Sequence, residues 1–344
     1  MNEKGSESHS KESHSELTGE EIDRILDYVL GHKMAFVHEF LRGRGLPFSG
    51  TKEKLRQRLE EYLQEGSVEA IDLLRLLNKI EGWGNQHIYL YRAAERLIEP
   101  WTTESSVQER LEKVGLAELL HRPRPLVLPD EPTLSSIEWS SDRVRFVWVE
   151  KRQWEERISE EDIEEGRTVW RAYRIRVSRG LIAFDWDLLS GHAMLAIQRL
   201  PRGSKYRPIR DRFEAELDEI VDLQQFDPIR VSRTIRPIES SGEVRRRQLA
   251  YQTHRGGKVR FTSASQSTDA FVDPDLERAG QALRSETAGI LGNFYWLSVP
   301  GKLERELHSK LYALDQRIGI FGEQKERDVR YVLSRIRHYC GQES

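Results

Sequence analysis

The sequence predicts an α+β protein with an N-terminal helical helix-turn-helix module, a helical connector, and a body of mixed, mainly antiparallel β-sheet with flanking helices. Apolar residues recur at helical spacing as far as about residue 120, whereas aromatic and β-branched residues alternate along short segments from residue 133 onward. Hairpin-length gaps and occasional helices separate these segments, without the regular helices of repeated βαβ units. We therefore expect neighbouring strands to run antiparallel.

The composition supports a folded chain of more than one domain. Its 344 residues are 38% hydrophobic and 32% charged, which excludes a wholly disordered protein. No apolar run approaches the roughly 20 residues that cross a bilayer, and no signal-like segment opens the chain, so we expect an intracellular protein without a membrane partner. The single cysteine, Cys340, excludes an internal disulfide framework and a cysteine-based metal cluster, and we expect it to be inert.

The first elements are helical. Residues 1–18 are rich in Ser, Glu, Lys and His, and we expect a disordered tail. Apolar residues three and four positions apart predict helices over 20–30, 33–42 and 51–64, with Thr51 as the N-cap of the third. These segments together predict a helix-turn-helix.

A connector follows the helix-turn-helix. It holds an amphipathic helix that ends at Gly82, a short apolar run over 87–91 and a further helix over 104–120. Four prolines between residues 123 and 132 predict a linker and a domain boundary.

Strand patterns dominate the rest of the chain. We expect strands over 143–149, 168–178 and 181–188. The stretch 155–165 between the first two holds seven carboxylates and is expected to form a solvated loop or short helix. The later expected elements are helices over 206–222, 274–286 and 325–339, a hairpin of strands 243–252 and 257–263 that turns at Arg255-Gly256-Gly257, and strands over 290–299 and 310–321.

One motif in the helix-turn-helix is specific. It reads Val37-x3-Leu41-x3-Gly45-Leu46-Pro47-Phe48-Ser49-Gly50-Thr51-Lys52-x2-Leu55-x2-Arg58-Leu59. This segment resembles the SAP domain, a short helix-turn-helix module, and the resemblance implies DNA binding. It covers about residues 31–66, a tenth of the chain.

The charges of this segment agree with a phosphate-binding role. Residues 31–59 hold seven basic and two acidic side chains, and several of the basic ones lie at the start of the third helix, where free N–H groups favour a phosphate. Gly50 lets a backbone approach closely. The expected contacts are Lys33, Arg42, Arg44, Gly50, Thr51, Lys52, Lys54, Arg56 and Arg58. The alternative is an ordinary helical hairpin with a solvated basic face.

A second basic region lies in the body. Residues 229–260 hold nine basic and two acidic side chains in a chain of net charge −3, and a further cluster lies over 202–212. An arginine-rich ribbon of this kind is suited to lie along a duplex. The expected contacts are Arg202, Lys205, Arg207, Arg245, Arg247, Arg255, Lys258 and Arg260. In the alternative, the acidic stretch 155–165 neutralises these cations within the molecule.

The order of elements after the SAP-like module is similar, more faintly, to the centromere protein N/Chl4 family. Helices, an apolar stretch near 83–91, an aromatic-rich antiparallel sheet and the helix over 207–221 follow one another. The resemblance implies contact with nucleosomal DNA through a positively charged groove between the two halves. It assigns no individual residue.

Catalytic signatures are sparse. The chain has no phosphate loop, no His-Glu-x2-His and no Gly-x-Ser-x-Gly segment. Asp185 and Asp187 share a strand face, with His192 soon after, and could hold Mg²⁺ for phosphodiester cleavage, although such a pair is more often a solvent face. Glu304, Glu306 and His308 alternate similarly. We expect neither an enzyme nor a cofactor or metal.

The sequence thus predicts a non-enzymatic protein that grips the backbone of double-stranded DNA through two surfaces, whose linkage raises avidity. We expect a DNA-docking or recruiting subunit with protein partners and no small-molecule substrate, cytoplasmic and nucleoid-associated, or nuclear and chromatin-associated in a eukaryote. A Mg-dependent nuclease and a protein-interaction scaffold remain as alternatives. The expected parts are a tail (1–18), the SAP-like module (19–66), the connector (67–125), an antiparallel α+β body (126–225) and a C-terminal α+β part with basic strands (226–344).

Overall fold

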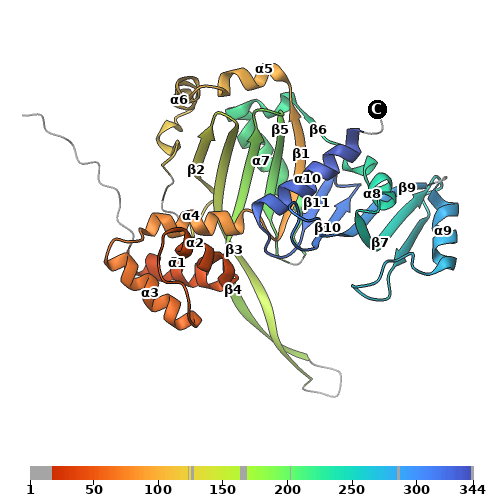
Figure 1. Ribbon diagram of the computed structural model, residues 1–344, viewed down its shortest axis with the longest axis horizontal. Helices are drawn as coiled ribbons and strands as arrows, with labels where there is room; N and C mark the ends of the chain where they lie inside the picture. Colours follow the sequence, from red (N-terminus) through yellow and green to blue (C-terminus); the bar gives the residue numbers. More distant parts are fainter. Residues whose placement is uncertain are drawn as a thin grey trace, which may run out of the picture. The chain divides into compact units, whose positions relative to one another are not determined.

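The computed structural model describes residues 18–122, 124, 128–162, 169–201, 203–284 and 287–341 (Figure 1). It divides into two compact units, one ending at Leu77 and one beginning at Asn78. The expected disordered tail lies outside the described residues, except for Thr18. The expected α+β class is confirmed, with N-terminal helices followed by an 11-stranded sheet.

The first unit is helical. It contains α1 (Gly19–Gly31), α2 (Met34–Gly43), α3 (Lys52–Gln64) and the first part of α4 (Ala70–Glu81). Thr18 caps α1 in a reciprocal pair with Glu21, and the Thr51 hydroxyl accepts a 3.4 Å hydrogen bond from the N–H of Lys54 at the start of α3. The three helices expected before residue 66 are therefore present, and their apolar faces form the core of this unit: Ile25, Leu26, Val37, Leu41, Leu55 and Leu59.

The second unit is built on one sheet. Its strands are β1 (Gln86–Ala93), β2 (Thr133–Ser140), β3 (Arg143–Asp162), β4 (Val169–Asp187), β5 (His192–Gln198), β6 (Phe226–Pro228), β7 (Val244–Thr253), β8 (Lys258–Thr262), β9 (Thr287–Trp296), β10 (Leu307–Tyr312) and β11 (Arg317–Ile320). They lie in the order β2-β3-β4-β5-β1-β11-β10-β9-β7-β8, and β6 pairs with β1. Neighbouring strands pair antiparallel throughout this order.

Two cores lie on opposite faces of this sheet. The helices of the second unit are α5 (Glu95–Ile98), α6 (Glu104–Lys113), α7 (Tyr206–Val221), α8 (Ile235–Ser240), α9 (Pro274–Arg284) and α10 (Glu326–Gly341). In β1, Tyr89 and Tyr91 belong to the core under α6 and α7, whereas Ile88 and Leu90 belong to the core under α8 and α10. Because side chains alternate along a strand, α7 covers one face near β5 and β1, and α10 covers the other face near β1 and β10.

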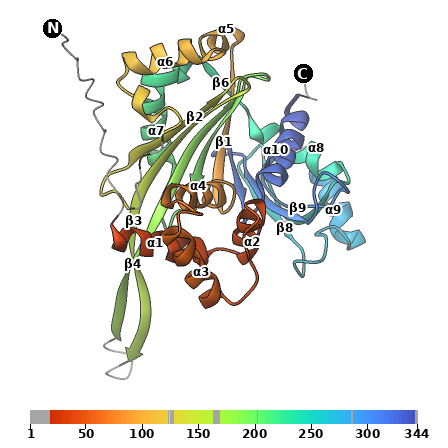
Figure 2. The same ribbon diagram turned by 60° about the vertical axis from the view of Figure 1, so that its left-hand side comes forward.

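The hairpin of β3 and β4 differs from expectation. Residues 155–162 of the acidic stretch are not a loop or short helix but the end of β3, while residues 163–165 lie outside the described residues. The two strands expected over 168–178 and 181–188 are the single strand β4, which begins at Val169. Cross-strand pairing with β4 holds these polar residues in a strand, although the side chains of residues 155–159 are exposed. The pair extends past the residues that contact β2 and β5 (Figure 2). We call residues 150–162 and 169–180 the arm.

Two further elements differ from the expectation. The strand expected over 310–321 is a hairpin of β10 and β11, whose turn places Gln316 at a φ of 50°. The short run expected over 87–91 in a helical connector is β1, which lies between β5 and β11 in the sheet.

Candidate nucleic-acid interface

The start of α3 is the exposed basic site of the first unit. Gly50 has a φ of 138°, and a β-carbon there would lie 3.2 Å from the side chain of Lys54. Lys52 and Lys54 are exposed, and neither forms an ion pair with a carboxylate in the described part of the chain. These two ammonium groups lie in the first turn of α3, where the helix dipole also favours an anion.

The expected arginines of the same unit are mostly engaged within the fold. Arg56 pairs with Asp23 at 2.9 Å, Asp27 at 2.5 Å and Glu60 at 2.9 Å. Arg44 pairs with Asp72 at 2.8 Å, and Arg58 donates to the carbonyl oxygen of Ser49. Arg42 lies over the ring of Phe48, and Lys33 is the N-cap residue of α2. The cations of this unit that are best placed for a phosphate are therefore Lys52 and Lys54.

A second basic surface lies on the sheet of the second unit. On the strands from β11 to β8, most of the side chains opposite the core of α8 and α10 are partly or fully exposed. We call this surface the open sheet face. Its residues are Arg245 and Gln248 of β7, Lys258, Arg260 and Thr262 of β8, Asn293 and Tyr295 of β9, His308, Lys310 and Tyr312 of β10, and Arg317 of β11.

The pairing register aligns these side chains in rows across the strands. One row contains Arg260, Ala250, Leu291, Tyr312 and Arg317, and the next contains Thr262, Gln248, Asn293, Lys310, Gly319 and His87. The five strands from β8 to β11 span about 20 Å at the usual spacing of roughly 4.8 Å between neighbours. The open sheet face is therefore long enough to contact several phosphates.

Aromatic rings stack along one side of the open sheet face. The ring of His308 lies 4.5 Å from that of Tyr295 and 4.6 Å from that of Phe321, with interplanar angles of 13° and 29°. Burial, together with the nearby charges of Lys310 and Arg247, lowers the pKa of His308 to about 4. The imidazole is therefore neutral at pH 7, and the positive charge of this surface comes from its lysines and arginines.

The cations of the open sheet face differ in availability. Lys258 and Arg260 are exposed, Lys310 is half-buried, and none of the three pairs with a described carboxylate. Burial lowers the pKa of Lys310, with Arg260 and Arg317 adding to the effect. Arg245, in contrast, makes two 2.6 Å hydrogen bonds to Glu306.

The other residues expected to bind DNA lie around this surface. Arg247 falls at a β-bulge and donates to Ser263, and Arg255 lies in the exposed turn between β7 and β8. Lys205 and Arg207 lie at the start of α7, and Arg202 is outside the described residues. The structure thus brings Arg245, Lys258 and Arg260 together on one face.

The acidic stretch does not supply the described partners of the central arginines in β7. Arg245 pairs with Glu306, and Arg246, on the opposite face, pairs with Asp269 at 2.8 Å. Intramolecular pairing of Arg245 and Arg246 therefore exists, but its carboxylates lie elsewhere than expected.

Several residues of the open sheet face were not expected from the sequence, among them Lys310, Tyr312 and Arg317. The alternation over 307–312 between buried Leu, Ser and Leu and partly exposed His, Lys and Tyr is the sequence signal that could have identified the first two. Arg317 becomes part of the surface only through the turn between β10 and β11.

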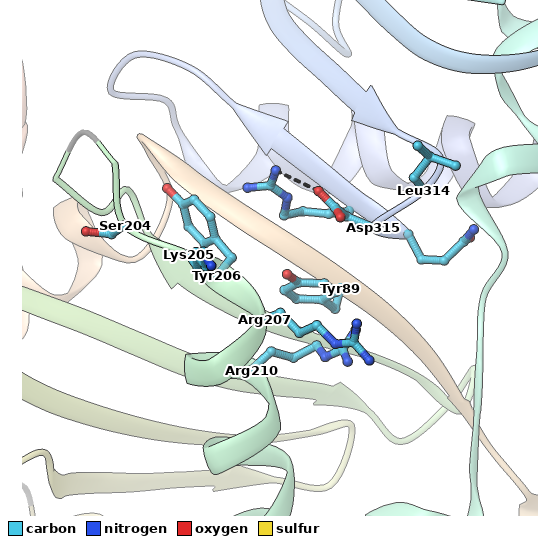
Figure 3. Close-up of a pocket in the computed structure, with 10 residues that line it drawn as sticks. Tyr89, Ser204, Lys205, Tyr206, Arg207, Arg210, Leu314 and Asp315 are labelled. Carbon is cyan, nitrogen blue, oxygen red and sulfur yellow. Dashed lines mark hydrogen bonds and ion pairs between the residues drawn. The ribbon is translucent and has the colours of Figure 1, made fainter. Parts of the chain in front are cut away.

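A pocket of about 480 Å³ lies where the open sheet face meets α7 (Figure 3). Its lining includes Tyr89 of β1, Lys205, Arg207 and Arg210 at the start of α7, and Arg317. The guanidinium of Arg317 lies between two rings, 4.4 Å from the centre of Tyr206 and 4.2 Å from that of Tyr312. Aromatic packing thus fixes one cation of this pocket in place.

The residues considered for metal-dependent cleavage have structural contacts instead. Asp185 is 3% exposed, and its carboxylate accepts hydrogen bonds from Arg143 and Arg330. The Asp187 carboxylate accepts a 2.8 Å bond from the N–H of Ser190 in the turn after β4. These contacts do not favour a metal at the pair.

The other acidic positions are also paired. Glu304 pairs with Arg327, and Glu306 with Arg245. No cluster of three or more His, Cys, Asp or Glu side chains in the described residues is arranged to hold a metal.

No helix of the described chain combines the length and apolar character needed to cross a bilayer.

Comparison with models of known protein families found no match, and comparison with curated proteins found no relative.

Proposed function

We propose that this chain binds double-stranded DNA by its phosphate backbone, with the open sheet face as the main contact surface. The observation that carries the proposal is the group of cations on that face. Lys258 and Arg260 lie on β8 and Lys310 lies on β10 of the same surface, and none of the three has a described carboxylate partner. A concentration of unpaired positive charge on a protein of net charge −3 favours a polyanionic ligand.

The start of α3 is the second contact surface in this proposal. Lys52 and Lys54 offer two exposed charges beside a helix N-terminus, an arrangement that contacts phosphate without reading base sequence. Two weak surfaces on one chain raise each other's effective concentration, so the whole chain binds more tightly than either surface alone. We therefore propose a non-enzymatic DNA-docking role with little sequence preference.

A part in a larger complex belongs to the same proposal. The arm exposes Ile158, Tyr173, Ile175 and Val177, of which Ile175 is 62% exposed. Apolar side chains grouped on an exposed ribbon are typical of surfaces that other proteins cover. This observation supports protein partners without identifying one.

The decisive experiment measures duplex affinity of the full chain as a function of salt. We expect the triple variant Lys258→Gln, Arg260→Gln, Lys310→Gln to bind a 30-base-pair duplex more weakly and to reduce the slope of log K against log salt by about two to three. The matched control is the double variant Lys113→Gln, Arg278→Gln. It removes exposed cations of α6 and α9, away from the open sheet face, and should bind as the wild type does.

Two results would contradict the proposal. One is a wild-type protein whose duplex affinity is absent or independent of salt. The other is a triple variant that folds as the wild type does and keeps the wild-type slope. Mg²⁺-dependent nicking by the purified protein would instead favour the nuclease alternative.

A further inference from the structure

The pocket beside α7 contains hydrogen-bond donors that the fold leaves unused. Tyr89 is 4% exposed, lines the pocket, and its hydroxyl has no hydrogen-bond partner among the described residues. Burial raises the pKa of this hydroxyl to about 12, so it keeps its proton and can donate. The rest of the side chain is buried, but the hydroxyl is accessible from the pocket, so a ligand there can accept a hydrogen bond from it.

A second set of unused donors is provided by the backbone of α7. This helix is 16 residues long, and its N-cap residue Lys205 makes no side-chain cap hydrogen bond. The N–H groups of Tyr206 and Arg207 have no partner in the part of the chain that is described. The start of α7 therefore presents free N–H groups and the positive end of a helix dipole to an anion.

The cations of the pocket outnumber the carboxylates that oppose them. Lys205 pairs with no described carboxylate, and the 3.8 Å contact of Arg207 with Asp211 is long and exposed. Arg210 pairs with Asp211 at 2.7 Å, and Arg317 with Asp315 at 3.1 Å. The first two cations are therefore free to bind a ligand, and the other two keep fixed positions in the wall.

The walls of the pocket suit a planar group as well as an anion. Tyr89 lies between Asp315 on one side and Arg207 and Arg210 on the other, with Tyr206 beside it (Figure 3). The guanidinium of Arg210 lies 5.2 Å from the centre of the Tyr89 ring. Tyr206 and Arg210 are partly exposed, and aromatic and guanidinium planes of this kind accept a nucleobase by stacking. A volume of about 480 Å³ is within the range of small-molecule sites and accepts one nucleotide, not a duplex.

We propose that this pocket binds a single nucleotide through its phosphate monoester, supplied either by a phosphorylated DNA end or by a free nucleoside monophosphate. The phosphate would contact Lys205, Arg207 and the start of α7, with the hydroxyl of Tyr89 as a further donor. If the phosphate belongs to a DNA end, this inference rests on the proposed DNA binding. If it belongs to a free nucleotide, the inference stands independently of that proposal. Arg317 belongs both to the open sheet face and to the pocket, so a strand on that face leads into the pocket.

The test compares DNA ends with free nucleotide, using the full chain. Fluorescence anisotropy is measured with an internally labelled 20-base-pair duplex that carries either 5′-phosphates, 3′-phosphates or hydroxyl ends, and with a covalently closed dumbbell that has no end. Isothermal titration measures AMP and inorganic phosphate directly. If the source is a strand end, we expect one phosphorylated duplex to bind about tenfold more tightly than the hydroxyl-ended duplex, as charge-assisted hydrogen bonds would give. If the source is free nucleotide, AMP binds more tightly than inorganic phosphate.

Two variants assign the effect to the pocket. The double variant Lys205→Gln, Arg207→Gln removes exposed side chains and should abolish the preference for a phosphate. Tyr89→Phe removes only the hydroxyl and should weaken the preference for a phosphate about fivefold, which is the scale of one hydrogen bond. Arg278→Gln in α9 and Tyr331→Phe in α10 are the matched controls on the opposite face of the sheet, and both should behave as the wild type does.

The outcomes separate this inference from the proposed function. Equal affinity for phosphorylated and hydroxyl-ended duplexes, together with no binding of AMP, would contradict nucleotide binding in this pocket, whether or not the dumbbell binds. Salt-dependent binding of the dumbbell in that case leaves the DNA-binding proposal standing. Binding of AMP that survives both pocket variants also overturns the inference, because the nucleotide would then bind elsewhere.

Discussion

The carboxylate of Asp185 in β4 accepts a 3.0 Å hydrogen bond from the guanidinium of Arg330 in α10. The same carboxylate accepts a bond from Arg143 of β3, and Arg143 also donates to Glu326 at the start of α10. Both guanidiniums lie near the ring of Trp83, at 5.7 and 4.9 Å from its centre. This network joins the first half of the sheet to the C-terminal helix, so we interpret Asp185 as a structural residue.

Replacement of Asp185 by Asn should destabilise the protein by about 3 kcal/mol, because it removes the buried one of the two carboxylates, Asp185 and Glu326, that the guanidiniums of Arg143 and Arg330 share. Urea unfolding measures the effect. The control is Asp187→Asn in the same strand, whose carboxylate caps an exposed turn and should cost less than about 1 kcal/mol. Equal losses for the two variants would contradict the structural role of Asp185.

The same carboxyl should make stability depend on acid. Burial alone would raise the pKa of Asp185, but Arg143, Arg145 and Arg330 more than compensate and leave that pKa below its ordinary value. A group whose pKa is lower in the folded state stabilises the fold above its unfolded pKa of about 3.9, and this contribution is lost as the pH falls through the folded pKa. The difference in the free energy of unfolding between the wild type and Asp185→Asn should therefore have its largest value at pH 7 and decrease below about pH 4. Urea titrations at pH 7, 5, 4 and 3 measure it, and a difference that stays constant would refute the argument.

The first unit allows binding and stability to be separated. Lys52→Gln with Lys54→Gln should lower the salt slope of duplex binding by up to about two without changing the melting temperature, because neither side chain has a described carboxylate partner. Arg56→Gln should leave the salt slope of duplex binding unchanged and lower the stability of the fold. It leaves three carboxylates close together and should cost up to about 1 kcal/mol, an amount limited by their exposure to solvent. An unchanged slope in the double lysine variant would remove α3 from the proposed interface.

The elements that the sequence predicted well are those with local causes. The start of α3 at Lys52 follows from the side chain of Thr51 and from apolar residues spaced three and four apart. The position of β1 depends on partners far along the chain, with Tyr91 opposite Ala193 and Ile88 opposite Ile318, and no local pattern encodes that pairing. In the arm, cross-strand hydrogen bonds override a composition that resembles a loop.

Only part of the candidate interface could be predicted, because some of its contacts join residues that lie far apart in the chain. Basic composition identified Arg245, Lys258 and Arg260, because charge can be counted in a sequence. It could not show that Arg56 and Arg245 are held by carboxylates, since Asp23 lies 33 residues from Arg56 and Glu306 lies 61 residues from Arg245. Nor could it place Arg317 between Tyr206 and Tyr312, which lie on separate elements.

Glu306 offers a gain-of-function test of the open sheet face. Its carboxylate holds Arg245 through two 2.6 Å hydrogen bonds and neutralises one cation of that face. Glu306→Gln should release this charge while Arg245 stays in position over the ring of Tyr295, 4.9 Å from its centre. We expect duplex affinity to rise about three- to tenfold at low salt and the salt slope to increase by about one.

The control for this variant is Glu304→Gln, which changes the net charge by the same amount two residues away. Glu304 pairs with Arg327 at the start of α10, the helix that packs on the opposite face of the sheet, so this change should leave the slope unaltered. A general gain from reduced net negative charge would raise both affinities equally, whereas a specific contact raises only that of Glu306→Gln. If the two variants bind alike, or if Glu306→Gln binds more weakly, then Arg245 does not contact the DNA backbone and the proposed surface has to exclude β7.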